Sequence, residues 1–284
     1  MRELRIARLN FFHWLSNPKY PVVLLYLFLY SYERIHDLGL LARDYATSIN
    51  PWVFPFLPGL GAGFLPLMLG FVLLVSDAPF RTRQQRLVMQ RTGKRTWLAG
   101  QLLYLLIVST GFTVLMWVLS WIWLLPNLTW HADWGALLTT LAINGSVPSD
   151  YAVWLQFPYD VVKNTNPVTV TLWCGASMTT VCFFLGSIMT ACNLWLKKGW
   201  GAAIIAVLTA ISLIPDTSSF NPGPIKFILW LSPLNWMDYS LMGHQEQYLP
   251  SHAFAIWGPA ALGLGLSIVL LLTIGKCNVE ADKE

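Results

Sequence analysis

Three polar side chains near the end of the chain could bind a metal ion or transfer protons. His244, Glu246 and His252 lie close together in the sequence, and histidine with carboxylate is a common zinc-binding combination. Their spacing does not match the H-E-x-x-H motif, because the run reads GHQEQ. We therefore expect solvated loop residues here and no metal site.

The sequence lacks the other common signatures of catalysis and cofactor binding. The run RTGKRT contains a Gly-Lys pair but lacks the first glycine and the preceding strand of a phosphate-binding loop, and no G-x-S-x-G motif occurs. The four cysteines show no paired metal-ligand spacing and are expected to be small buried hydrophobic residues. We expect no catalytic residue and no cofactor bound by this chain, so it is not predicted to be an enzyme.

Charged residues also cluster at residues 33–37, in the run ERIHD. Ionisable residues within a membrane segment often line a path for ions or protons. Glu33 and Asp37 share one helical face at a spacing of four residues, so they are candidates for such a lining. A solvated helix end explains the same residues, and both interpretations stay open.

Positive charge is concentrated in one short stretch. Only 11% of the residues are charged, yet SDAPFRTRQQRLVMQRTGKRTWLAG, residues 76–100, contains six basic side chains with no acid between them. Such a cluster fixes the orientation of a membrane protein without any further role. A role beyond orientation therefore depends on whether these residues also form a defined structure.

The same stretch predicts a helix over residues 78–92. Asp77 can cap its start and Gly93 can end it. Phe80, Leu87 and Val88 are its apolar contacts, and they are surrounded by Arg81, Arg83, Arg86 and Arg91. A capped helix with a compact apolar patch suits the groove of another protein.

The elements that must position these residues are strongly apolar. Hydrophobic residues make up 55% of the chain, the mean hydropathy is +0.53, and long windows contain no charged side chain. Crossing a bilayer takes about 20 mostly apolar residues in a helix. We predict an all-α integral membrane protein with six spans, at about 20–39, 52–76, 97–125, 168–196, 200–215 and 253–275. The first span could instead be the apolar core of a signal peptide.

The distribution of Lys and Arg predicts the orientation. Fourteen of these residues lie on the face that carries both termini, the 77–96 loop and the 197–198 turn, and four lie on the other face. Because cytoplasmic loops are enriched in Lys and Arg, both termini and the 77–96 loop are predicted to be cytoplasmic. The net charge of +4 needs no nucleic acid to explain it.

The segments outside the spans have predicted structures of their own. Residues 1–16 read as an interfacial helix that lies on the membrane. Residues 126–167 form an outer loop. Residues 216–252 contain FILWLSPLNWM, which is too short to span and is interrupted by Pro233, so we predict re-entrant helices at the outer face.

In this order, the elements resemble the permease subunits of type-2 ABC exporters. In that family a surface helix precedes six spans, a cytoplasmic coupling helix joins spans two and three, and short re-entrant helices separate spans five and six. Residues 1–16, the 77–96 loop and PGPIKFILWLSPLNWMDYSL occupy those three places, and RLVMQRTGKRTWLAGQLLY is similar to the family's coupling loop. The family's acidic ERE…GT pattern is absent, and RTRQQR stands in its place.

The resemblance implies an activity and partners. The chain would be a permease of a bacterial plasma membrane, paired with a second permease, identical or related, and with two copies of an ATPase subunit that binds ATP and Mg²⁺. It would export a hydrophobic or amphipathic substrate, such as an antibiotic, a peptide or a lipid. The coupling helix would dock on the ATPase through residues Phe80, Arg81, Arg83, Arg86, Leu87, Val88 and Arg91, and the pathway would be lined by Tyr26, Tyr30, Glu33 and Asp37.

Two other functions compete with export. A membrane-embedded enzyme or assembly factor would act at the outer face through His131, His244 and His252, and changes at Leu87 and Arg91 would leave it unaffected. A small secondary carrier is disfavoured, because the cores of spans two to six contain no ionisable residue and no repeat is visible.

Overall fold

The computed structural model describes residues 2–12, 17–59, 63–80, 83–145, 151–196, 199–213, 228–243 and 249–275. Throughout these ranges the regular elements are helices, apart from one isolated β-bridge between Ile49 and Leu128. The predicted all-α class is therefore confirmed.

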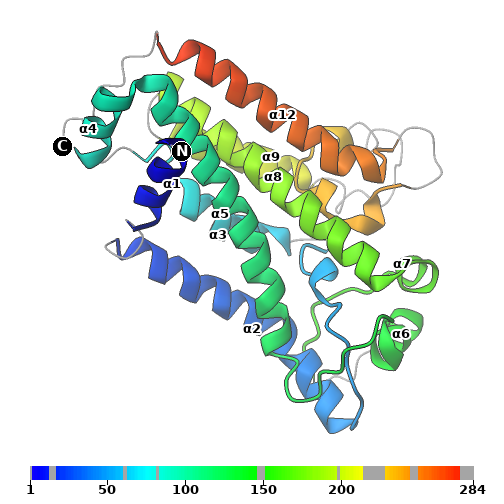
Figure 1. Ribbon diagram of the computed structural model, residues 1–284. Helices are drawn as coiled ribbons and strands as arrows, with labels where there is room; N and C mark the ends of the chain where they lie inside the picture. The colour runs from blue at the N-terminus through cyan, green and yellow to red at the C-terminus, as the bar shows by residue number, and fades with distance from the viewer. Residues whose placement is uncertain are drawn as a thin grey trace.

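Three helices are long and apolar enough to cross a membrane, namely α5 (Lys94–Ile122), α8 (Pro167–Trp195) and α12 (His252–Thr273). They correspond to the third, fourth and sixth predicted spans. Helix α8 packs against both of the others, and the three run side by side in Figure 1. Glycines permit the close approach, because a Cβ at Gly186 would collide with Leu105 of α5 and one at Gly263 would press on Phe183 of α8.

The other predicted spans are shorter or more polar. Helix α2 (Lys19–Asp44) extends beyond the predicted first span and carries the charged run ERIHD in its second half. Helix α9 (Trp200–Ser212) has 13 residues. The second predicted span is not one continuous helix, because the 3-10 helix η2 (Phe54–Phe56) is separated from α3 (Phe64–Val75) by a break. Six membrane crossings remain a prediction.

Two tyrosines of α2 hold the break before α3. The Tyr30 hydroxyl donates to the carbonyl oxygens of Leu57 (3.2 Å) and Gly63 (2.8 Å), and the Tyr26 hydroxyl donates to that of Pro66 (2.8 Å). A chain that leaves helical geometry in apolar surroundings frees backbone carbonyls, which then need other donors. The two hydroxyls supply those donors and fix α2 against the start of α3.

The N-terminal helix α1 (Arg2–Phe12) packs across the beginning of α5. Its buried face carries Ile6, Ala7 and Asn10, whereas Leu4 and Phe11 are exposed. The contact is close because Gly100 has no side chain, and a Cβ there would lie 2.7 Å from Cβ of Ile6. Residues 13–16 of the predicted surface helix lie outside the described residues.

The predicted outer loop is partly helical. It contains α6 (Gly135–Asn144) and α7 (Tyr159–Asn164), which lie at the end of the long helices opposite α4 (Arg83–Thr92) in Figure 1. The Trp134 indole N–H donates to the Thr165 carbonyl at 2.9 Å and joins the segment before α6 to the end of α7. The Asn50 side chain donates to the Asp133 carboxylate and connects this region to the segment after α2.

Part of the predicted re-entrant region forms short turns. Residues 228–230 lie in a helical turn, followed by η3 (Asn235–Met237) and η4 (Tyr239–Leu241), while residues 216–227 and 244–248 lie outside the described part. The Ser177 hydroxyl of α8 donates to the Trp236 carbonyl at 2.6 Å. The Asn235 side chain donates to the Ser212 carbonyl at 3.1 Å, so the turns are fixed to both α8 and α9.

Candidate functional site

Helix α4 corresponds to the predicted docking helix, but it begins later than expected. The expected start at Ala78 is wrong, because residues 76–80 form turns and α4 begins at Arg83. The Asp77 carboxylate lies 2.8 Å from Lys19 Nζ at the start of α2. The Asn193 side chain of α8 donates to the Ala78 carbonyl at 2.7 Å. Bonds to distant residues thus hold this turn against α2 and α8.

The predicted end of the helix is confirmed. Gly93 has a positive φ of 85°, a conformation that glycine adopts at little steric cost, and its N–H donates to the Met89 carbonyl at 2.9 Å. Helix α5 then begins directly at Lys94. The short helix and the membrane-length helix therefore meet at a sharp corner.

The predicted docking residues do not share one surface. Leu87 has 60% of its surface exposed and Arg91 is also exposed, whereas Val88 is half-buried. Phe80 is buried, with its ring edge-on to that of Tyr104 at a centroid distance of 5.0 Å. Arg81 and the side chains of Arg83 and Arg86 lie outside what the structure describes. Leu87 and Arg91 thus form the outward face of α4, and Phe80 belongs to the core.

Three buried carboxamides connect α4 to its neighbours, and they were not predicted from the sequence. Asn10 of α1 donates to Gln101 Oε1 at 2.9 Å, Gln101 of α5 donates to Gln85 Oε1 at 3.4 Å, and Gln85 of α4 donates to Asn10 Oδ1 at 2.6 Å. The Trp97 indole N–H also donates to Gln85 Oε1, at 2.9 Å. We call Asn10, Gln85 and Gln101 the amide ring. Polar residues 91 and 75 positions apart carry no local signal of such pairing.

A small hydrophobic cluster lies beside the amide ring and joins α4 to several helices. Val88 and Met89 of α4 pack against it. We call this cluster the basal core, and its buried members are Ile6, Trp97, Leu98, Leu102, Ala191, Leu270 and Ile274. These residues come from α1, α5, α8 and the end of α12. The inward face of α4 therefore contacts the same cluster as the ends of all three membrane-length helices.

The four predicted pathway residues have separate contacts in the described part of the chain. The hydroxyls of Tyr26 and Tyr30 are bonded to carbonyls at the break before α3, and Glu33 is exposed. Asp37 lies 3.1 Å from the His36 ring nitrogen and accepts from the Ala152 N–H at 2.9 Å. Their observed contacts fix α2 to its neighbours, and a pathway role remains a prediction.

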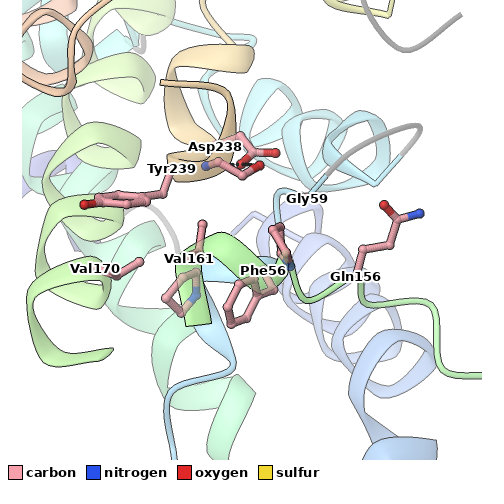
Figure 2. Close-up of a pocket in the computed structure, with 10 residues that line it drawn as sticks. Phe56, Gly59, Gln156, Val161, Val170, Asp238 and Tyr239 are labelled. Atoms are coloured by element: carbon pink, nitrogen blue, oxygen red, sulfur yellow. Dashed lines mark hydrogen bonds between the residues drawn. The ribbon is translucent and has the colours of Figure 1, made fainter. Parts of the chain in front are cut away.

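A pocket lies beside α7 (Figure 2), and α7 is at the end of the long helices opposite α4 (Figure 1). The pocket's cavity volume is only about 10 Å³, roughly the room for one water molecule. Its walls come from four segments that are distant in the sequence: the chain around η2, residues 156–161, the first turn of α8 and the start of η4. Phe56, Val161 and Val170 make it largely apolar, while Gln156 and Asp238 add polar groups.

Asp238 is the buried charged group of this pocket. Its carboxylate accepts from the Ser240 N–H at 2.8 Å and from the Ser240 hydroxyl at 2.7 Å, and so caps η4. Burial raises the pKa of the Asp238 carboxyl, and the hydrogen bonds from Ser240 partly oppose that shift. Asp-x-Ser in the sequence signals a cap, but only the tertiary structure reveals that the carboxyl is buried.

Of the outer-face histidines named as an alternative site, His131 and His252 have different neighbours. His131 is exposed, and its backbone carbonyl accepts from the Trp52 indole. The His252 ring stacks on the Tyr239 ring at 4.2 Å, next to the pocket, while His244 lies outside the described residues. Among the described residues no three His, Cys, Asp or Glu side chains are grouped to hold a metal ion.

Comparisons of this chain with protein-family models, with curated proteins and with solved structures find no match.

Proposed function

We propose that this chain is the membrane-spanning permease subunit of an ATP-driven exporter and that a separate ATPase subunit docks on α4. The observation that carries the proposal is an exposed leucine on a basic helix whose inward face is joined to membrane-length helices. A leucine that is 60% exposed beside an arginine suits an amphipathic groove with acidic residues at its edge. A loop that served only to fix topology would need no such anchoring.

The proposal includes a topology and an assembly. Six crossings would place both termini and α4 in the cytoplasm, as the distribution of Lys and Arg favours. The chain would pair with a second permease, and each would receive one ATPase that binds ATP and Mg²⁺. The exposed apolar faces of the long helices favour a hydrophobic or amphipathic substrate.

The test is complex formation with candidate ABC ATPase subunits from the same organism. We expect the ATPase to co-purify with the parent protein and to hydrolyse ATP faster when bound. Leu87→Asp should abolish both effects, because it places a charge in the apolar contact. Ile143→Asp is the matched control, since Ile143 is 61% exposed on α6 at the opposite end and should leave binding unchanged. Equal binding by the parent and the Leu87→Asp protein would refute the docking role.

The outer pocket favours a second candidate function, that of an enzyme or assembly factor at the outer face. Its specific support is the buried carboxyl of Asp238 in a largely apolar pocket, an environment found at many catalytic sites. On that function, Asp238→Asn abolishes activity and Leu87→Asp has no effect. On the export function, Leu87→Asp abolishes activity whatever the state of Asp238.

A further inference from the structure

The amide ring has a geometry that suits a rigid connection between helices. Each of its three carboxamides donates one hydrogen bond to the next and accepts one from the previous, so the bonds form a closed cycle. All three side chains are at most 5% exposed. Opening the cycle in such a place leaves buried donors and acceptors without partners, which is strongly unfavourable.

The direct connection between α4 and α5 supplies little rigidity by itself. It consists of Gly93 alone, at which an added Cβ would meet no atom within 4 Å. Its N–H donates to Met89 and its carbonyl accepts from Trp97, but no side chain packs where a Cβ would lie, so a single glycine offers little resistance to a change of angle between the two helices. Among the α4 side chains that the structure describes, those that contact the rest of the molecule from its inward face are Gln85 in the amide ring and Val88 and Met89 at the basal core, and we infer that they orient α4.

The two kinds of contact resist different motions. Apolar contacts such as those of Val88 and Met89 are non-directional, so they hold α4 against the molecule but tolerate sliding and rotation. The hydrogen bonds of Gln85 run to a separate helix on each side, to Asn10 of α1 and, through Gln101 and Trp97, to α5. Because these bonds are directional and run to two helices, a large rotation of α4 would have to break or stretch at least one of them.

We propose that the amide ring is the element that transmits displacement of α4 to α1 and to the beginning of α5. Gln85 acts as a positioning residue that makes these three helices move as one body. The physiological meaning of this connection rests on the proposed docking of an ATPase to α4, whereas the rigidity itself does not. A partner that pulls on Leu87 and Arg91 thus moves α5 and the residues of the basal core that it carries. The displacement passes through the amide ring and is not absorbed by bending at Gly93.

The rigidity is tested in the full chain without any partner. Cys174, Cys182, Cys192 and Cys277 are replaced by alanine, and spin labels are placed on Leu9→Cys of α1 and Gln90→Cys of α4, which are both exposed. Double electron–electron resonance should give one narrow distance distribution for the parent. Gln85→Leu and Asn10→Leu should each broaden it, and Asn144→Leu, an exposed amide on α6, should not. An unchanged distribution in both ring variants overturns the proposal.

The transmission is tested with the partner ATPase in place. Asn10 lies in α1, so Asn10→Leu changes no residue of α4. If the variant still binds the ATPase, its docking face is intact, and any loss of stimulation is not caused by misfolding of α4. We expect it to bind the ATPase with the parent's affinity, while stimulation of ATP hydrolysis falls roughly 2- to 30-fold, the range for a residue that modulates coupling between sites. Full stimulation overturns the transmission role. If no ATPase binds the parent, the proposed function fails, and the resonance experiment still decides whether the ring is rigid.

Discussion

At the scale of single residues, Asp238 links the outer pocket to a measurable pH dependence. Its carboxyl pKa is raised by burial, so the folded protein holds this proton at pH values where the unfolded chain has released it. The stability contributed by the protonated carboxyl is full below about pH 4, the ordinary range for aspartate. It is lost as the pH rises through the raised pKa of the folded protein.

We predict that Asp238→Asn is at least as stable as the parent at pH 7.5. Asparagine keeps an oxygen that accepts the Ser240 N–H, and it removes the unfavourable burial of a charge. The advantage of the variant should shrink as the pH falls toward 4, because the parent carboxyl becomes neutral there. Thermal unfolding in detergent, followed by tryptophan fluorescence between pH 4.5 and pH 8, measures the difference. A variant that is less stable at pH 7.5 would show that the ionised carboxylate is favoured in the fold.

At the scale of elements, Tyr30 makes two of the three hydrogen bonds from α2 that hold the break before α3. Tyr30→Phe removes the donor to the Leu57 and Gly63 carbonyls in a buried position, which we expect to cost about 1–3 kcal/mol. Tyr32→Phe is the matched control, because Tyr32 lies on the same helix and is 43% exposed. Unfolding temperatures of the two variants give the comparison. Equal unfolding temperatures would mean that the break does not need the Tyr30 hydroxyl.

The sequence predicts the uniform elements well and the interrupted ones poorly. The limits of α8 follow from local signals, since Asn166 caps it through a bond from the Val168 N–H and Pro167 occupies its first turn. At Asp77 the local signal misplaces the start of the helix, because α4 begins at Arg83 and Asp77 pairs with Lys19 at 2.8 Å. Such long-range pairs decide the outcome wherever the local preference is worth only about 1 kcal/mol.

The candidate sites divide in the same way. The exposure of Leu87 and the corner at Gly93 follow from helical periodicity and from glycine's conformational freedom. The amide ring and the Asp238 pocket could not be predicted from such local patterns, because each brings together residues from three or more distant segments. Periodicity describes which face of a helix is polar, but it does not identify the partner of that face.

At the scale of the whole molecule, the separation of the two candidate sites predicts which side of the membrane each one faces. Helices α1 and α4 lie at one end of the long helices, and α6 lies at the other (Figure 1). In a protein without its native cysteines, Leu9→Cys and Leu87→Cys should react with a membrane-impermeant maleimide only from the cytoplasmic side. Ile143→Cys should react only from the outside. All three side chains are exposed on the surface of the chain, so the fold itself shields none of them from the reagent.

Each pair of labels tests a different part of the chain. Leu87 and Ile143 are separated by α5, so labelling from opposite sides requires that α5 crosses the bilayer. Leu9 and Leu87 are separated by α2, η2 and α3, so labelling from the same side requires that this interrupted segment crosses an even number of times. Labelling of Leu9 and Leu87 from opposite sides would leave α2 as a single crossing and would contradict six spans. It would also separate Asn10 from Gln85, which the amide ring forbids.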